Sequence, residues 1–203
     1  MGRWLTKLVD NGIITALVLI LATAGMGIFL HHNRMQKQRV YFTEHQEGLA
    51  TAYRASVQMY HLAMESFYSN TINSADILHV FAQGAKAEGT KRSLARGRLY
   101  RWLYPQYLTM RDHNLQQLHF HLADGSSYLR FHKPDRYGDD LSEVRHSIRA
   151  VNTLHQPMHG FERGRVRSGF RYVYPIFWEK KHIGSVEVSV TAKGIRDAMA
   201  ELY

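Results

Sequence analysis

The chain of 203 residues contains no cysteine. This absence excludes a disulfide framework, thiolate metal sites and cysteine nucleophiles, and it suits a protein exported into an oxidising space. The sequence also lacks the G-x-S-x-G, H-E-x-x-H and phosphate-loop motifs of hydrolases and nucleotide-binding enzymes. We therefore expect no catalytic machinery and no cofactor.

Acidic residues are fewer than basic ones: 17 Asp and Glu stand against 26 Lys and Arg, and the formal net charge is +9. A basic surface suits nucleic acid, an anionic membrane surface or anionic ligands. The cations are spread along the chain, and no nucleic-acid motif accompanies them. We expect a solvated basic surface near lipid head groups and no nucleic-acid partner.

No charged residue occurs from Asn11 to Leu30, and the run from Ile13 onward is almost wholly apolar. At ~1.5 Å per residue, twenty helical positions extend about 30 Å, which matches the hydrocarbon core of a bilayer. A cleaved signal peptide is the alternative, but its apolar region would be shorter and would end in a small-residue site. The apolar run continues past the weak candidate site at Ala22-Thr23-Ala24, which favours an uncleaved signal-anchor.

The sequence thus predicts a cytoplasmic tail at residues 1–10 and a transmembrane signal-anchor at residues 11–32. Basic residues flank the apolar run on both sides, so the positive-inside rule does not decide the orientation. The short N-terminal tail and the large C-terminal part favour a C-terminal part outside the cytoplasm.

A proline-free stretch from Arg34 to Ser69 predicts one long helix that continues from the anchor. Its apolar residues recur at spacings of three and four, which predicts a core-facing stripe. The outer side of this helix leads us to expect a parallel homodimer. The stripe consists of Leu49, Tyr53, Val57, Tyr60, Met64 and Phe67.

The rest of the chain predicts two shorter helices followed by strands. The helices cover about residues 73–87 and 91–110, and the second ends at Tyr104 if Pro105 stops it. From Gln117 onward the period changes to two, which predicts strands. Further predicted elements are a helix from about residue 139, strands at 160–163, 169–178 and 182–190, and a helix at 193–203.

These elements predict an α+β fold, in which a transmembrane helix continues into a long helix packed on a small antiparallel sheet of about five strands. The domain itself is expected over residues 33–192. Two tight turns, at Asp124-Gly125 and at Lys180-Lys181, set the predicted register.

Directly opposed residues share a face of a sheet, so the register divides the side chains into two sets. The apolar set is the predicted core: Leu118, Phe120, Leu122, Leu129, Phe131, Val173, Phe177, Val186 and Val188. The other set is polar and aromatic, as the wall of a small-ligand pocket is. Its members are His119, His121, Tyr128, Arg130, His132, Tyr172, Tyr174, Ser185, Glu187 and Ser189.

Three segments behind the signal-anchor and long helix resemble the single-domain form of the Cache family of bacterial extracytoplasmic sensors. They are FHLADGSSYLRFHKPDRYGDDL at 120–141, GFRYVYPIF at 169–177 and HIGSVE at 182–187. The resemblance covers about residues 34–190. It implies a PAS-like sheet that binds small metabolites for a histidine kinase, chemoreceptor or diguanylate cyclase, with an inner-membrane anchor and a periplasmic domain. Such receptors continue into a second membrane helix, toward which residues 193–203 would lead, and an output domain, whereas this chain stops at Tyr203.

The resemblance puts four residues at ligand-facing positions and adds Arg145, on the covering helix, as a further candidate. His121 and Tyr174 complete the set from the predicted polar face. The planar fork of the arginine at position 130 suits a carboxylate, so we expect a carboxylate-bearing metabolite. The four positions are Arg130, His132, Tyr172 and Glu187.

A divalent-metal sensor is the alternative. His119, His121 and His132 share the predicted polar face with Glu187, and three imidazoles with a carboxylate suit zinc or nickel. The chain contains 13 histidines, however, so a chance cluster is also expected.

Overall fold

The computed structural model describes residues 2–163 and 168–203, with side chains from residue 13 onward. These residues form two compact units, one up to Thr51 and one from Ala52 to Tyr203. The first helix, α1 (Gly2–Phe67), contributes residues to both units. The side chains of the predicted tail at 1–10 lie outside the described part.

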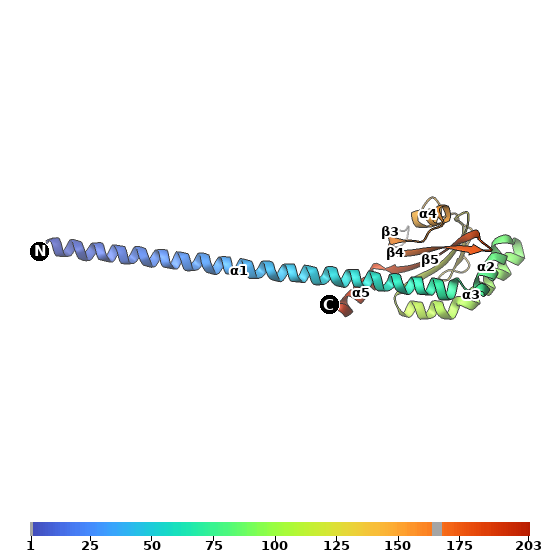
Figure 1. The fold of residues 1–203 in the computed structure, drawn as a ribbon, viewed down its shortest axis with the longest axis horizontal. Helices are drawn as coiled ribbons and strands as arrows, with labels where there is room; N and C mark the ends of the chain where they lie inside the picture. Colours follow the sequence, from blue (N-terminus) through green and yellow to red (C-terminus); the bar gives the residue numbers. More distant parts are fainter. Residues whose placement is uncertain (1, 164–167) are drawn as a thin grey trace. The chain divides into compact units, whose positions relative to one another are not determined.

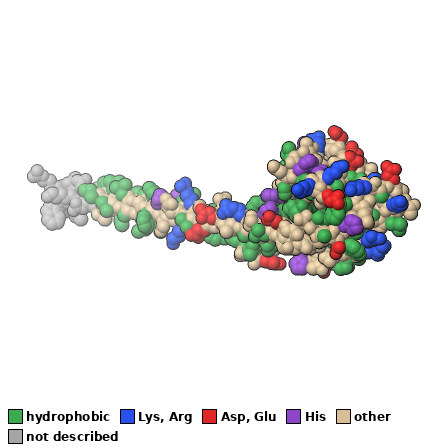
Figure 2. Space-filling model, turned by 45° about the vertical axis from the view of Figure 1, so that its right-hand side comes forward, with side chains coloured by type: hydrophobic (Ala, Val, Ile, Leu, Met, Phe, Trp, Pro, Cys, Tyr) green, Lys and Arg blue, Asp and Glu red, His purple; other side chains and the backbone are tan. Residues whose placement is uncertain are grey.

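The first unit is a helix whose described beginning is apolar and exposed. Leu21 and Ile28 expose 70% and 72% of their surface, and hydrophobic side chains cover this stretch in Figure 2. Among the described residues, α1 is the one helix long and apolar enough to cross a membrane, with a window of mean hydropathy 2.5. Charged side chains follow from Arg34 onward. The anchor at residues 11–32 stays a prediction that these features favour.

The second unit contains the end of α1 and ten further elements. The helical ones are a short π-helix at Tyr68–Ile72, α2 (Ala75–Lys86), α3 (Gly89–Asp112), α4 (His146–Leu154) and α5 (Ala192–Leu202). The strands are β1 (Leu115–Leu122), β2 (Ser127–Arg130), β3 (Met158–Glu162), β4 (Gly169–Trp178) and β5 (Lys181–Thr191).

The five strands form one antiparallel sheet in the order β2-β1-β5-β4-β3. The end of α1 packs with α2 and α3 on one face, and α4 lies over the other, as Figure 1 shows. The predicted α+β fold with a long N-terminal helix and a five-stranded antiparallel sheet is therefore confirmed.

Of the two predicted ends of the second short helix, the one near residue 110 is correct: α3 continues through Pro105 to Asp112. Pro105 and Arg101 are both exposed, so water can satisfy the carbonyl that proline leaves without a donor. One predicted helix start is wrong: the helix expected from residue 139 begins only at His146, because the preceding residues form a loop beside β2.

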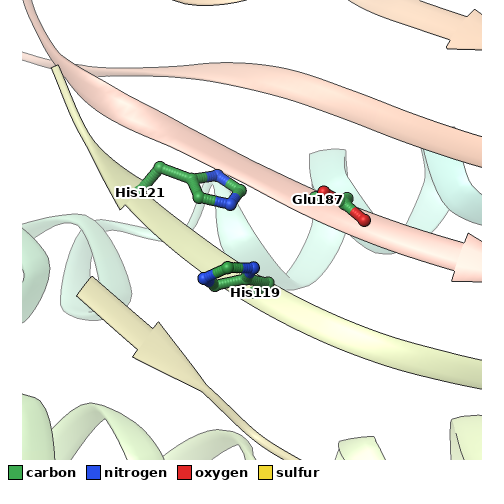
Figure 3. Close-up of side chains that lie close together, drawn as sticks. All are labelled: His119, His121 and Glu187. Carbon is green, nitrogen blue, oxygen red and sulfur yellow. The ribbon is translucent and has the colours of Figure 1, made fainter. Parts of the chain in front are cut away.

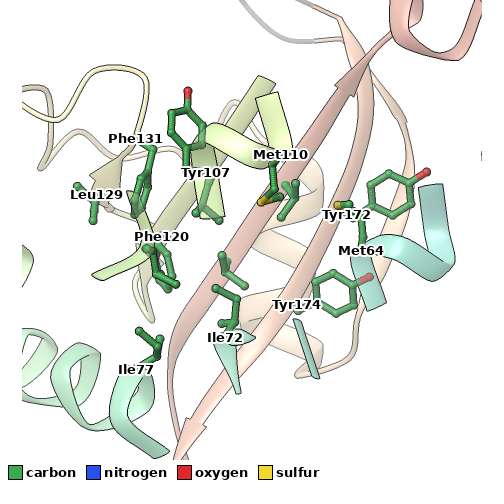
Figure 4. Packing of buried hydrophobic residues seen from close by; sticks show 14 of the residues in the cluster. Met64, Ile72, Ile77, Tyr107, Met110, Phe120, Leu129, Phe131, Tyr172 and Tyr174 are labelled. Atoms are coloured by element: carbon green, nitrogen blue, oxygen red, sulfur yellow. The ribbon is translucent and has the colours of Figure 1, made fainter. Parts of the chain in front are cut away.

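The core lies between the sheet and the helices α1, α2 and α3 (Figure 4). The Phe120 ring lies 5.4 Å from that of Phe81, which also packs edge-on against Tyr128. From the predicted stripe of α1, Tyr60 and Met64 are buried here, whereas Tyr53 remains 44% exposed. Apolar burial of this extent is the main stabilising term of such a domain.

The predicted register of β1 and β2 is correct over most of the hairpin. His119 pairs with Arg130 and Phe120 with Leu129, as predicted. A β-bulge then shifts the register, so that His121 rather than Leu122 lies opposite Ser127. This bulge turns Tyr128 into the hydrophobic core, away from the polar face to which the sequence assigned it.

The predicted register of β4 and β5 is wrong, and the correction moves two candidate site residues. The turn is Glu179-Lys180, both with positive φ, which is one residue earlier than predicted. That change alone moves the pairing by two residues, so each side chain would stay on its predicted face of the sheet. A second β-bulge, between Ile176 and Phe177, adds a shift of one residue. The side chains of β4 before this bulge therefore lie on the face opposite to the predicted one.

Tyr172 and Tyr174 therefore oppose Val188 and Val186 and lie on the helix-covered face. Both are buried in the core, where the ring of Tyr174 stacks on that of Tyr68 at 4.5 Å. Their neighbour Val173 takes the place predicted for them and opposes Glu187. The predicted core position of Phe177 is also wrong, since this ring is 36% exposed.

Gly184 lets β1 and β5 approach closely at the end of the sheet near the β1–β2 turn. It has a φ of 153°, and a Cβ atom at this position would overlap the carbonyl oxygen of His121. Only glycine fits such an approach. The backbone of His121, and with it the orientation of its ring, is thus fixed by a residue of the facing strand.

Candidate functional site

The sheet face beneath α4 is polar although it is buried. We use the term polar face for the buried side chains that β1, β2, β4 and β5 contribute to it. At most 7% of the surface of any of them is exposed: His119, His121, Ser127, Arg130, Arg171, Ser185, Glu187 and Ser189. Buried polar groups are costly unless they are paired, so the pairing defines what this face can bind.

Glu187 is the centre of the polar face and is fully buried. Its two carboxylate oxygens accept hydrogen bonds from Arg145 and Arg171, each at 2.5 Å. Burial raises the pKa of Glu187, but the two guanidinium groups outweigh it, and the pKa lies below its ordinary value. The carboxylate is therefore ionised and forms ion pairs with both guanidinium groups.

Arg145 also connects α4 to the sheet. It precedes the helix, and its Nε donates to Glu162 of β3 at 3.0 Å. The Glu162 carboxylate in turn accepts from the backbone N–H and the hydroxyl of Ser147 at 3.2 and 2.8 Å, in the first turn of α4. An anion is favourable at this end of a helix, so the contact holds α4 over the polar face.

Two histidines lie beside Glu187 on the neighbouring strand (Figure 3). The rings of His119 and His121 are 4.0 Å apart. The Nε2 atom of His119 lies 2.8 Å from the Ser127 hydroxyl, and Nδ1 of His121 lies 3.3 Å from that of Ser185. The Nε2 atom of His121 is buried and has no hydrogen-bond partner among the described residues.

Both imidazoles are neutral in the folded chain. Burial lowers the pKa of His119 well below 6.5, and the neighbouring His121 lowers it further. Burial also lowers the pKa of His121 to about 3, despite the opposing effect of Glu187. A neutral, unpartnered ring nitrogen can accept a hydrogen bond from a ligand or donate one, depending on its tautomer.

Arg130 lies at the rim of the polar face and is held by a loop carboxylate. Its two terminal nitrogens donate to the two oxygens of Asp139 at 2.7 and 2.8 Å. The hydrogen bond from Arg130 lowers the pKa of Asp139. The Asp139 side chain is 37% exposed, whereas that of Arg130 is 9% exposed. The geometry is the bidentate pair in which arginine recognises carboxylates.

Of the seven residues predicted for ligand binding, four meet on this face: Arg130, His121, Glu187 and Arg145. His132 does not join them, because β2 ends at Arg130 and His132 is exposed in the turn that follows. Tyr172 and Tyr174 are on the opposite face, for the reason given above.

Sequence reasoning missed Arg171, Glu162 and Asp139. Arg171 opposes Ser189 and lies on the face of Glu187, so a correct position for the second bulge would have revealed it. Asp139 was expected in a helix rather than in a loop beside Arg130. No sequence signal indicated that Glu162, at the end of β3, would contact α4.

Three members of the polar face are close enough to hold a metal ion. Donor atoms of His119, His121 and Glu187 lie within 4.8 Å of one another. Both oxygens of Glu187 are already bonded to guanidinium groups, so a divalent cation would have to displace one of them and would then face a second cation nearby. This arrangement disfavours a divalent cation.

The fold and the buried polar face define a ligand-sensing domain of the Cache type. A family described as the double sensory domain of two-component sensor kinases, dCache_3, matches residues 42–202. The chain therefore belongs to the dCache_3 family. Its Cache-type character, predicted from the sequence, is confirmed, although the family is described as double and the described residues contain one five-stranded sheet.

Solved sensor domains share this fold at low identity. The sensor domain of the histidine kinase DctB from V. cholerae is 15% identical with a TM-score of 0.58, over 79% of this chain and 60% of that one. The sensory domain of the Campylobacter jejuni chemoreceptor Tlp3 with isoleucine is 16% identical, with a TM-score of 0.55 over 76% and 61%. The same chemoreceptor domain with L-valine gives a TM-score of 0.56 at 15% identity, over 76% of this chain and 61% of that one.

This chain thus spans about 60% of the length of these solved domains. No curated protein matches it.

Proposed function

We propose that the chain is the sensing part of a signal-transduction receptor in the bacterial inner membrane. Residues 11–32 would anchor it, and residues 33–192 would form the domain in the periplasm or outside the cell. The apolar start of α1 and the membership of a sensory family support this proposal. Residues 193–203, which include most of α5, would lead toward a second membrane helix. The parallel homodimer stays a prediction.

The domain would bind a ligand rather than catalyse a reaction. The solved domains of similar fold are sensors of a histidine kinase and of a chemoreceptor, and the Tlp3 domain was solved with isoleucine and with L-valine. Each of these amino acids carries a carboxylate. We propose that the ligand of this chain also carries one, and that the polar face is where it binds.

The observation that carries this proposal is the Arg130–Asp139 pair. The guanidinium group is almost buried, and its partner belongs to an exposed loop. A ligand carboxylate has the same charge and the same two oxygens as Asp139, so it can replace Asp139 on Arg130 without leaving a buried charge unpaired. The displaced Asp139 would be solvated at small cost, because it is already 37% exposed.

The same exchange at Glu187 would be far less favourable. This carboxylate is inaccessible to solvent and holds Arg145 and Arg171 together. Its removal would leave the buried Arg171 without a carboxylate partner and Arg145 with Glu162 alone. Glu187 would therefore preserve the structure of the site, while Arg130 would bind the ligand.

Ligand exchange at Arg130 would be transmitted to the β2 edge. The backbone N–H of Ser127 donates to the carbonyl of Asp139 at 2.9 Å, and that of Gly138 donates to the carbonyl of Ser127 at 2.7 Å. A ligand shifts such an equilibrium only by its differential affinity for the two arrangements. Replacement of Asp139 weakens one attachment of this loop, which gives the ligand an effect beyond its own contacts.

Two substitutions with opposite expected effects test the ligand proposal. The full chain in lipid nanodiscs is titrated calorimetrically with a panel of organic acids and amino acids. Arg130→Gln should weaken binding of any carboxylate ligand by about 10- to 100-fold, as expected for loss of a charge-assisted bidentate contact. Asp139→Asn should tighten binding, because it weakens the internal competitor for the guanidinium group.

Arg98→Gln is the matched control, since Arg98 is exposed on α3 and lies outside the polar face. It should leave the affinity unchanged. Weaker binding by the Asp139→Asn variant would contradict the exchange, and a panel without any binder would contradict the ligand class.

The divalent-metal alternative has less support, because three guanidinium groups surround the candidate donors and His132 lies outside the cluster. A thermal-shift series with zinc and nickel separates it from the carboxylate proposal. We expect no stabilisation that a chelator reverses. Stabilisation that disappears in the His121→Ala variant would instead favour the metal.

A further inference from the structure

A groove of about 940 Å³ lies on the domain, apart from the ion pairs of the polar face. It is bounded by the end of α2, the first turns of α3, the β1–β2 turn and the beginning of β5. We call it the α2–α3 groove. Arg130, Arg145, Arg171 and Glu187 do not line it.

The groove has an excess of positive charge. Four cations line it, Lys86, Arg92, Arg96 and Lys181, against the single carboxylate of Asp124. Among the described residues, none of the four cations forms a salt bridge. The Asp124 carboxylate is turned to its own loop, where it accepts from the backbone N–H and the hydroxyl of Ser126 at 2.8 and 2.6 Å.

Arg96 distinguishes this groove from an ordinary solvated basic surface. Only 9% of its surface is exposed. Its guanidinium carbon lies 3.3 Å from the centre of the Tyr137 ring, and one nitrogen donates to the Ser93 hydroxyl at 3.2 Å. A cation buried to this extent is ordinarily paired with an anion, and the described residues supply none.

Other groups of the groove also favour a bound anion. Arg92 is fixed by the carbonyl of Ala87, to which its Nε donates at 2.6 Å. The first turn of α3 contains no acidic residue, and the side chain of Glu88 forms no capping hydrogen bond there. The free N–H groups of this 24-residue helix thus add positive potential beside the four cations.

Tyr128 also lines the groove. Its ring lies on the core side of β2, and its hydroxyl is buried without a hydrogen-bond partner. A Cβ atom on Gly84, the residue before the groove residue Ala85, would overlap this hydroxyl. The absence of a side chain at Gly84 therefore lets the Tyr128 ring occupy this position.

We propose that the α2–α3 groove binds a small oxyanion with two or more negative charges, of the phosphate or polycarboxylate class. Arginine forks, lysine ammonium groups and helix N–H donors together recognise such groups. The groove shares Ser127 with the polar face, and its wall residues Tyr137 and Gly138 directly precede Asp139. An anion bound here would therefore contact the loop that holds Arg130.

The test uses inorganic pyrophosphate and citrate as probes on the full chain in nanodiscs, with ionic strength held constant by sodium chloride. At least one probe should bind saturably. The double variant Lys86→Gln/Lys181→Gln should weaken this binding about tenfold or more. Both lysines are exposed, so the variant is expected to fold.

The double variant Lys91→Gln/Lys180→Gln is the matched control, because it removes the same charge from exposed lysines that do not line the groove. It should bind the probes as the unaltered chain does. Equal affinity of the two double variants, or no saturable binding of either probe, would overturn the proposal. Loss of probe binding in Arg130→Gln but not in Lys86→Gln/Lys181→Gln would place the anion on the polar face instead.

Discussion

Replacing Glu187 with glutamine is expected to lower the free energy of unfolding of the domain by about 3–5 kcal/mol, because removal of one partner from a buried ion pair leaves uncompensated charge. Glu187 is fully buried and holds Arg145 and Arg171 through separate oxygens. The amide keeps the shape of the carboxylate but loses its charge, and one of its two polar atoms can no longer accept a hydrogen bond. Urea denaturation of the unaltered and variant chains measures the difference.

Glu143→Gln is the matched control. It makes the same chemical change at an exposed residue, and its effect should stay within about 0.5 kcal/mol. A loss below about 1 kcal/mol for Glu187→Gln would contradict the central place given to this carboxylate. In that case the contacts that remain, Glu162 for Arg145 and Gln117 for Arg171, would be sufficient to hold the two guanidinium groups.

The fold could be predicted from local pattern because each element carries its own signal. The proline-free stripe of α1 and the alternation from Gln117 onward reflect side-chain periods of 3.6 and 2. The pairing of His119 with Arg130 followed from the Asp124-Gly125 turn, which fixes a register over a few residues. Helix ends were less predictable, since the continuation of α3 through Pro105 depends on solvent exposure in the folded chain.

The candidate site was only half predictable, because a single bulge decides which side chains of a strand are buried together. In the pattern Arg171-Tyr172-Val173-Tyr174, the two tyrosines share one face of the strand and the arginine lies on the other. Either face could be turned to the hydrophobic core in a buried strand. The bulge between Ile176 and Phe177 determines that Arg171 lies on the polar face beside Glu187. No local preference at these residues reveals where that bulge falls.

The groups that complete the site come from segments without regular structure or at strand ends. Asp139 lies in the loop after β2, and Glu162 is the last residue of β3. Their contacts with Arg130 and with α4 depend on how distant segments pack. Turn motifs and periodicity describe neighbours along the chain, so they carry no information on such contacts.

Acidification from pH 7.5 to 5 is expected to destabilise the domain by about 2 kcal/mol for each of the two buried histidines, His119 and His121. The folded pKa of both lies below the unfolded value of 6.5, so the unfolded chain binds protons first. The stability associated with these rings is present above pH 6.5. It is lost progressively as the pH falls toward about 3, the folded pKa of His121. The slope steepens as the pH falls and approaches about 1.4 kcal/mol per pH unit for each ring near pH 5.

The window above pH 5 isolates the histidines from the carboxylates. The pKa of Glu187 and that of Asp139 are both lowered by guanidinium groups, so these residues also favour the folded state at higher pH, but their contribution changes only below about pH 4.5. Urea denaturation at several pH values between 7.5 and 5 measures the slope. His121→Gln should reduce this slope by the contribution of one titrating ring.

His182→Gln is a control at a histidine that is only partly buried. Burial also lowers the pKa of His182, but this ring is only partly buried, so its removal should change the slope less than His121→Gln does. The close approach of His119 and His121, with ring centres 4.0 Å apart, makes protonation of both at once still less favourable in the folded state. A free energy of unfolding that stays constant between pH 7.5 and 5 would show that these two rings are accessible to protons in the folded chain. The polar face would then be open to water rather than sealed beneath α4.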